Sequence, residues 1–284
     1  MTEGRHALRE ILLCGVRGST PAPGAEFAQV GGNTSCVAVT AADDRLLVLD
    51  AGTGFRRLAR ELGPRPLRGS VLLTHLHWDH VQGLPFLSNA DRDDAEVHVY
   101  LPDQGSGNAT ELLAQIMTPP YFPIEPDCLR GTWQRQTLDE GTFVIEGFEV
   151  TAAAISHKGG RTFGYRVSDG SSSLAYLPDH APKVASTAEL DAALRLADGV
   201  DVLLHDTQFL EAERSLADAF GHATLDDALA FADRAHVGRL VLFHHAPDRT
   251  DAEMDVLAVA GTPGGRAVVV GREGDRIALG NASA

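Results

Sequence analysis

The chain contains the stretch Thr74-His75-Leu76-His77-Trp78-Asp79-His80, which places four side chains that can bind a metal within six positions. It directly follows the apolar, β-prone run 70–73, so the histidines are predicted to begin where a buried strand ends. Because side chains alternate along an extended segment, His75 and His77 can project together while the leucine between them faces the core. The aspartate and the last histidine then follow in a turn and point to an adjacent location. The stretch predicts a metal site.

Three histidines and one aspartate are more ligands than one tetrahedral ion needs from so short a segment, if other ligands exist elsewhere. A pair of metals is therefore expected. Imidazole and carboxylate together suit zinc, manganese or iron. The alternative is a chance cluster on a solvated loop, but three of the 12 histidines in 284 residues fall within six positions, which makes chance a poor explanation.

The pattern His75-x-His77-x-Asp79-His80 after an apolar strand resembles the signature of the metallo-β-lactamase superfamily. Members are mostly hydrolytic enzymes that hold one or two metals. The resemblance implies an α/β (α+β) fold: a four-layer αβ/βα sandwich of two mixed β-sheets flanked by helices. It also implies further ligands at strand ends downstream.

Such partners occur in order, each after an apolar run: His157, Asp179 and His244. The resemblance assigns His75, His77 and His157 to one metal and Asp79, His80 and His244 to the other, with Asp179 bridging both. At the last position the register is open by one residue, and we prefer His244 to His245 because it directly follows its strand. Zinc is the expected metal of the pair, with manganese or iron as alternatives.

Two more motifs, His205-Asp206-Thr207 and Gly221-His222-Ala223-Thr224, resemble the paired motifs of the ribonuclease Z and phosphodiesterase branch. That resemblance assigns His222 as general acid for the leaving group and Asp206 as the residue that orients it. The branch often has Glu where this chain has Asp206. A histidine that merely packs beside a helix start is the alternative for His222. Asp79 is expected both to bind metal and to orient the attacking hydroxide. The resemblance also implies that Asp50 supports the ligands from beneath, with a plain turn or cap role as the alternative.

The net charge of the chain restricts the class of substrate that it can bind. Lys and Arg number 24 and Asp and Glu 39, a formal charge of −15. Affinity for nucleic acid comes chiefly from basic residues, and we identify no basic, Gly-rich arm like the one with which ribonuclease Z clamps tRNA. We therefore expect a small anionic phosphodiester, with a cyclic nucleotide as one example, rather than long nucleic acid. A lactonase or thioesterase on the same scaffold is the first alternative, and a metal-binding or sensing protein without turnover the second.

No linker or repeat divides the chain, which favours one domain over 1–284 with an insertion near 105–130. Four prolines between 118 and 126, with two aromatic residues, can wall a substrate pocket or pack the loop onto the core. Three cysteines without a CxxC pair, no signal peptide and no apolar run of membrane length favour a cytoplasmic protein. The sequence does not decide between a monomer and a homodimer.

Apolar periodicity and turn residues predict the remaining elements. Strands are expected at 11–16, 36–40, 46–49, 96–101, 132–138, 143–145, 148–154, 162–167, 173–177, 200–204, 240–243 and 267–270, and helices at 55–62, 110–117, 225–232 and 251–260.

Overall fold

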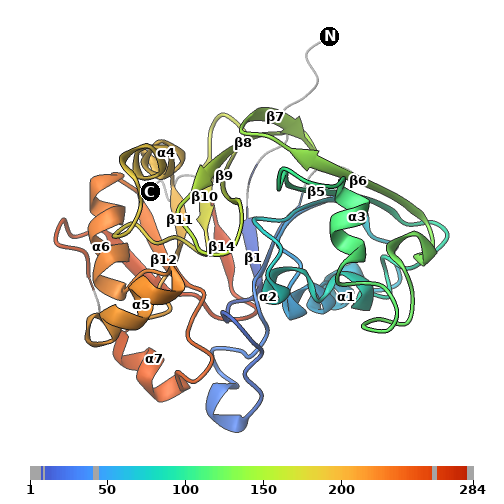
Figure 1. The fold of residues 1–284 in the computed structure, drawn as a ribbon. Coiled ribbons are helices and arrows are strands. Elements are labelled where there is room, and N and C mark those ends of the chain that lie inside the picture. Colours follow the sequence, from blue (N-terminus) through green and yellow to red (C-terminus); the bar gives the residue numbers. More distant parts are fainter. Residues whose placement is uncertain (1–7, 9, 41–44, 258–260, 280–284) are drawn as a thin grey trace.

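Short apolar runs of the sequence form two seven-stranded β-sheets in the computed structural model, which describes residues 8, 10–40, 45–257 and 261–279 (Figure 1). The first sheet has the order β14 (Arg276–Ala278), β1 (Glu10–Gly15), β2 (Cys36–Thr40), β3 (Leu46–Leu49), β4 (Arg68–Leu72), β5 (Glu96–Pro102) and β6 (Thr132–Leu138). The second has the order β13 (Ala267–Val270), β12 (Arg239–Phe243), β11 (Val202–Asp206), β10 (Ser173–Leu177), β9 (Thr162–Ser168), β8 (Phe148–Ile155) and β7 (Gly141–Ile145).

Both sheets are mixed. Strands β3 to β6 are parallel in the first sheet, and β10 to β13 are parallel in the second, while the remaining neighbours pair antiparallel. The carboxyl ends of parallel strands meet at one edge of a sheet, which is where ligand sites of such sheets form. Most of the predicted site residues lie at the end of a strand or directly after it, whereas Asp79 and His80 lie in a short helix and His222 lies between two helices. The topology thus brings distant parts of the chain together.

Strand side chains alternate between two apolar clusters, as the two-residue period requires. In β2, Val37 and Val39 face a cluster that lies between the sheets, whereas Cys36 and Ala38 face a second cluster on the outer side of the first sheet. All four of these side chains are buried. One core therefore joins the sheets, and another fixes the first sheet to its covering helices.

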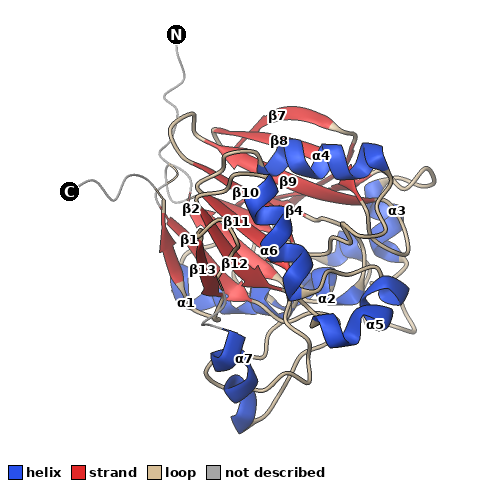
Figure 2. Cartoon of the chain, turned by 90° about the vertical axis from the view of Figure 1, so that its left-hand side faces the viewer, coloured by secondary structure: helices blue, strands red, loops and turns tan. Residues whose placement is uncertain are grey.

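Helices form the two outer layers. They are α1 (Leu58–Leu62), α2 (Trp78–Val81), α3 (Ala109–Ala114), α4 (Thr187–Ala197), α5 (Arg214–Phe220), α6 (Leu225–Arg234) and α7 (Asp251–Leu257). Buried residues of α1 and α3 join the outer cluster of the first sheet, while α4 and α6 pack on the second sheet (Figure 2). This arrangement confirms the four-layer αβ/βα sandwich. None of the helices in the described residues is both long enough and apolar enough to cross a bilayer.

Some local expectations were wrong. The turn expected around Asp79 is the single helical turn α2, in which the Gln82 N–H bonds to the Trp78 carbonyl four positions earlier. The helix expected at 55–62 begins as a 3₁₀ turn, Thr53–Arg57, before α1. Helix α4 and strand β14 were not anticipated. The helix expected at 251–260 is α7, and residues 258–260 lie outside the described part of the chain.

The segment 105–130 is the connection between β5 and β6, which are parallel neighbours. Parallel strands need a long crossover, and here the crossover holds α3 followed by the proline-rich loop. Asn108 caps α3 in a capping box with Glu111, which sets where that helix begins.

Candidate metal centre

Three imidazoles form the first group of the site. His75, His77 and His157 each place one ring nitrogen within 4.8 Å of the others. Nε2 of His157 lies 3.3 Å from Nδ1 of His77. The other nitrogen of His157, Nδ1, donates a hydrogen bond of 2.7 Å to the Gly221 carbonyl. That bond fixes the tautomer and leaves the lone pair of Nε2 facing the group.

A carboxylate and two imidazoles form the second group. Oδ2 of Asp79 lies 3.3 Å from Nε2 of His80 and 3.2 Å from Nε2 of His244. The neighbouring His245 turns away, because its Nε2 donates to the Gly271 carbonyl over 2.8 Å. The structure therefore places His244, and not His245, beside the carboxylates.

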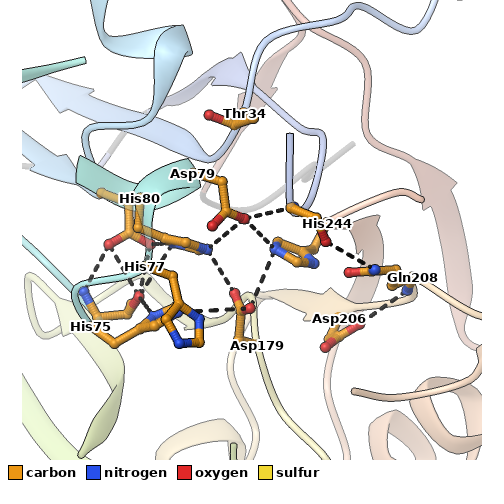
Figure 3. A network of polar contacts seen from close by, with 12 residues as sticks. Thr34, His75, His77, Asp79, His80, Asp179, Asp206, Gln208 and His244 are labelled. Atoms are coloured by element: carbon orange, nitrogen blue, oxygen red, sulfur yellow. Dashed lines mark hydrogen bonds and ion pairs between the residues drawn. The ribbon is translucent and has the colours of Figure 1, made fainter. Parts of the chain in front are cut away.

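Asp179 lies between the two groups (Figure 3). Its Oδ2 is 3.0 Å from Nε2 of His80, and its Oδ1 is 3.3 Å from Nε2 of His244. The same Oδ1 is 3.6 Å from Nε2 of His157 and 4.0 Å from Nε2 of His75. One carboxylate at the end of β10 thus faces ligand atoms of both groups.

Asp50, directly after β3, supports the second group from beneath. Its Oδ2 accepts a hydrogen bond of 2.7 Å from Nδ1 of His80 and one of 3.0 Å from the Tyr176 hydroxyl. Its Oδ1 accepts the Thr74 N–H at 2.7 Å. A carboxylate behind a histidine fixes the ring orientation and raises the basicity of the opposite nitrogen.

Several buried atoms of the candidate ligands have no hydrogen-bond partner among the described residues: Nε2 of His75, Nε2 of His80 and Oδ2 of Asp179. Buried polar atoms in proteins almost always have one. Burial would raise the pKa of Asp179, but the surrounding imidazoles, chiefly those of His244 and His80, hold it well below its usual range. Ionised carboxylates and imidazoles that converge in this way fit a divalent metal.

The Asp206–His222 pair adjoins these groups. Oδ2 of Asp206 lies 2.7 Å from Nδ1 of His222, which is itself 3.9 Å from Oδ1 of Asp179. Burial lowers the pKa of His222, but the nearby carboxylates, with Asp206 first among them, outweigh it and raise the pKa to about 8. His222 follows α5, and Thr224 then caps α6 in a capping box with Asp227.

Backbone donors hold Asp206 in place. Its Oδ2 accepts the His180 N–H at 3.2 Å, and its Oδ1 accepts the Gln208 N–H at 3.0 Å. His180 itself is fully buried, with Nδ1 2.9 Å from Nε2 of His205. All nine predicted site residues therefore lie in one cluster.

Ser19 is a site residue that the sequence did not identify. Its N–H donates to Oδ2 of Asp79 over 2.7 Å, and its Oγ accepts from Nε2 of Gln208 at 3.1 Å. The backbone of Ser19 is left-handed, with φ of 60°. Just before it, a Cβ on Gly18 would lie 2.4 Å from the His244 ring, so only glycine fits there. The turn-rich loop 15–21 was visible in the sequence, but nothing linked it to Asp79.

Two cavities open onto the cluster. One, of about 410 Å³, is lined by Ser19, Trp78, Asp79, Asp179 and His222 among others. The other, of about 520 Å³, is lined by His157, Phe209 and Phe220, and His222 lines it too. His222 therefore borders both spaces, whereas His80 borders neither.

Comparison with known proteins identifies the family and its relatives. A family model described as a beta-lactamase superfamily domain matches residues 45–245. The chain is 29% identical over 239 residues to a ribonuclease Z of Exiguobacterium sp., an alignment that covers 68% of this chain and 76% of the relative.

Solved structures show the same fold. The metallo-beta-lactamase fold protein YhfI of Bacillus subtilis aligns with a TM-score of 0.71 at 17% identity, over 95% of this chain and 99% of that one. A diphosphatase of the PhnP family aligns with a TM-score of 0.71 at 18% identity, over 95% of this chain and 97% of the other.

Proposed function

This chain belongs to the beta-lactamase superfamily, whose model covers most of its length, and from that premise we propose that it is a phosphodiesterase for small substrates. It is a metal-dependent hydrolase, and the proposal concerns its substrate, its metals and its proton donor. The observation that carries the proposal is the 2.7 Å contact of Asp206 with His222, whose imidazole borders both cavities.

Two divalent cations, with zinc expected, fit the donor atoms. His75, His77 and His157 would hold one, and Asp79, His80 and His244 the other, while Asp179 would contact both. Cations held by these residues would supply an acidified water and would neutralise charge on the substrate oxygens. The Ser19 N–H, 2.7 Å from Oδ2 of Asp79, fixes the direction in which that carboxylate points.

The role of His222 follows from the chemistry of the leaving group. When water attacks phosphorus, the bond from phosphorus to the ester oxygen breaks, and the departing alkoxide needs a proton. Asp206 accepts the hydrogen bond of Nδ1, so the opposite nitrogen, Nε2, would deliver the proton. The carboxylate keeps the ring oriented and favours its protonated form at neutral pH. The proton that the attacking water loses restores the imidazolium through solvent.

The name of the curated relative favours a second candidate, cleavage of tRNA. The formal charge of −15 argues against it, because a polyphosphate would be repelled at low salt. We expect the protein to hydrolyse cyclic nucleotides. We expect no cleavage of a tRNA precursor at any salt concentration between roughly 50 and 200 mM, the range over which the affinity of proteins for nucleic acid changes most. Cleavage of the precursor at a rate above that of the small diesters would favour the second candidate.

Comparing two leaving groups tests the proposal. Ring opening of cyclic AMP expels a strongly basic alkoxide, whereas bis(p-nitrophenyl) phosphate expels a weakly basic phenolate that needs no proton. With metal restored, His222→Ala should lower kcat on cyclic AMP by about 100- to 10,000-fold and on the p-nitrophenyl ester far less. His236→Ala, which removes a histidine whose side chain is 72% exposed, is the matched control.

Equal losses on both esters would show that His222 is not the proton donor. Turnover of lactones or thioesters with no turnover of either phosphodiester would replace the proposal by acyl hydrolysis. Metal content and circular dichroism, measured on each variant, separate these outcomes from unfolding.

A further inference from the structure

A third cavity, of about 650 Å³, lies beside the metal centre and is lined by α2, α3 and the loop 118–126. We infer that it holds an aryl group of the substrate, on the ester arm that stays attached to phosphorus. This inference rests on the proposed function and deepens it. Cavities of roughly 300 to 1,000 Å³ are the size that small molecules occupy in proteins.

Helix α2 connects the cavity to the metal centre. Asp79 and His80 face the ligand cluster, whereas Trp78 and Val81, three positions apart on the same helix, line the cavity. Residues three positions apart lie on one helix face. Trp78 also lines the 410 Å³ cavity above the metal groups, so the two spaces share a wall.

Exposed aromatic side chains gather at this site. Among the described residues, the Phe, Tyr and Trp side chains that are mostly exposed are Trp78 (74%), Tyr121 (85%), Phe86 (58%) and Phe220 (56%). The first three line the 650 Å³ cavity, and Phe220 lines the cavity on the other side of His222. Large apolar side chains left open to water commonly mark a binding site. The ring of Phe86 meets that of Phe122 edge to face at 5.8 Å, which fixes one wall.

The charges of the cavity indicate a neutral occupant. Arg135 is the only charged residue among those that line it. Its Nη1 pairs with Oδ1 of Asp127 at 2.7 Å, and its Nη2 donates to the Pro126 carbonyl. The charge of the guanidinium is thus already paired with a carboxylate and is not directed at a phosphate in the cavity. An uncharged flat group that stacks on Trp78 or Tyr121 fits this lining.

The order of the cavities assigns the two ester arms. Trp78 separates the aryl cavity from the central one, and His222 lies between the central one and the 520 Å³ cavity. The arm that leaves must reach His222, so the arm that stays points toward Trp78. The products would be an aryl phosphate monoester and the alcohol of the other arm.

The test varies the retained arm and keeps the leaving group constant. We compare kcat/KM for the methyl, phenyl and 2-naphthyl esters of p-nitrophenyl phosphate. Thymidine 5′-p-nitrophenyl phosphate is included as a substrate whose retained arm is a nucleoside. Burial of one aromatic ring should favour the phenyl ester over the methyl ester by about 10- to 100-fold. Ile116→Trp, which fills the cavity, should remove most of that ratio. Val144→Trp, which adds the same side chain at a position 76% exposed on β7, should leave the ratio as it is.

Tyr121→Ala is a second variant, because an 85% exposed side chain contributes little to folding; it should lower the ratio about 3- to 10-fold. Equal kcat/KM for methyl and phenyl esters, an unchanged ratio in Ile116→Trp, or a preference for the nucleoside ester would overturn the inference and leave the proposed function standing. The inference would also be overturned if the preference for aryl esters decreased with increasing protein concentration, as the protein forms a dimer.

If no diester is hydrolysed, the proposed function fails, and binding of the neutral probe N-phenyl-1-naphthylamine decides the inference separately. A fluorescence gain with the metal-loaded protein that Ile116→Trp abolishes and Val144→Trp retains would support an aryl cavity. No gain with the unmodified protein would overturn it.

Discussion

Asp50 with His80 and Asp206 with His222 are two carboxylate–imidazole pairs with the same separation of 2.7 Å between Oδ2 and Nδ1. Both aspartates are fully buried. The pairs differ in what the rest of the imidazole meets. The His80 ring is 0% exposed, and its Nε2 is 3.0 Å from Asp179. His222 is 7% exposed, and it borders two cavities.

The comparison indicates that the pair itself does not set the role of the histidine. In both pairs the carboxylate fixes the ring and leaves the opposite nitrogen available. Where that nitrogen is enclosed by carboxylates, as at His80, it suits a metal. Where the ring borders open space, as at His222, it can exchange a proton with a bound substrate and then with solvent.

Removing each histidine in turn should give the largest effects and the clearest contrast. We expect His80→Ala to lose metal and to reduce turnover of cyclic AMP to background, because one group of donors is then incomplete. His222→Ala should keep its metal while losing turnover. Metal content measured by inductively coupled plasma mass spectrometry, beside kcat, distinguishes them. Comparable metal loss in both variants would mean that His222 is a ligand and that the contrast is false.

Exchanging each aspartate for asparagine should give intermediate effects. Asp50→Asn should weaken metal binding about 10- to 100-fold and recover turnover when metal is in excess. Asparagine tolerates the left-handed backbone of Asp50, with φ of 59°. Asp206→Asn should leave metal affinity as it is and lower kcat by about 10- to 100-fold, because the ring of His222 loses its orienting charge. Competitive titration with a chromophoric chelator measures the affinity, and full rescue of Asp206→Asn by metal would contradict the assignment.

The sequence indicated both regions, but on different grounds. The segment 74–80 is contiguous, so its candidate ligands could be proposed from their spacing, whereas Asp206 and His222 were proposed from the resemblance of two separate motifs. Strands at 36–40, 46–49, 132–138 and 173–177 were also predicted with the bounds they have, because each is a short apolar or alternating run between turn residues. Helix α4 was missed although Ser186 and Glu189 form a capping box at its start. Strand β14 has only three residues, too few for a period.

Contacts between segments that are distant in the chain could not be predicted from the sequence. The N–H of Ser19 meets Asp79 across 60 positions, and His180 meets the carboxylate of Asp206 through its backbone. Neither contact depends on a residue type that a motif would contain, since any residue with an N–H could donate. The apolar cavity could not be predicted from the sequence for a related reason. The sequence of the proline-rich loop is compatible both with walling a pocket and with packing onto the core, and only the packing around Trp78 and Tyr121 shows an open space.

The smallest expected effect concerns one hydrogen bond behind the metal centre. Tyr176 and Tyr165 are both fully buried; the first donates to Oδ2 of Asp50 at 3.0 Å, the second to the Leu73 carbonyl at 2.7 Å. Either Phe variant should lower the free energy of unfolding by about 1 kcal/mol. Only Tyr176→Phe should also weaken metal binding, by a few-fold, because its partner orients His80. Denaturation with urea, with and without chelator, measures the free energy of unfolding and the part of it that depends on metal. If Tyr165→Phe changes the metal-dependent part as much as Tyr176→Phe does, Tyr176 does not act through Asp50.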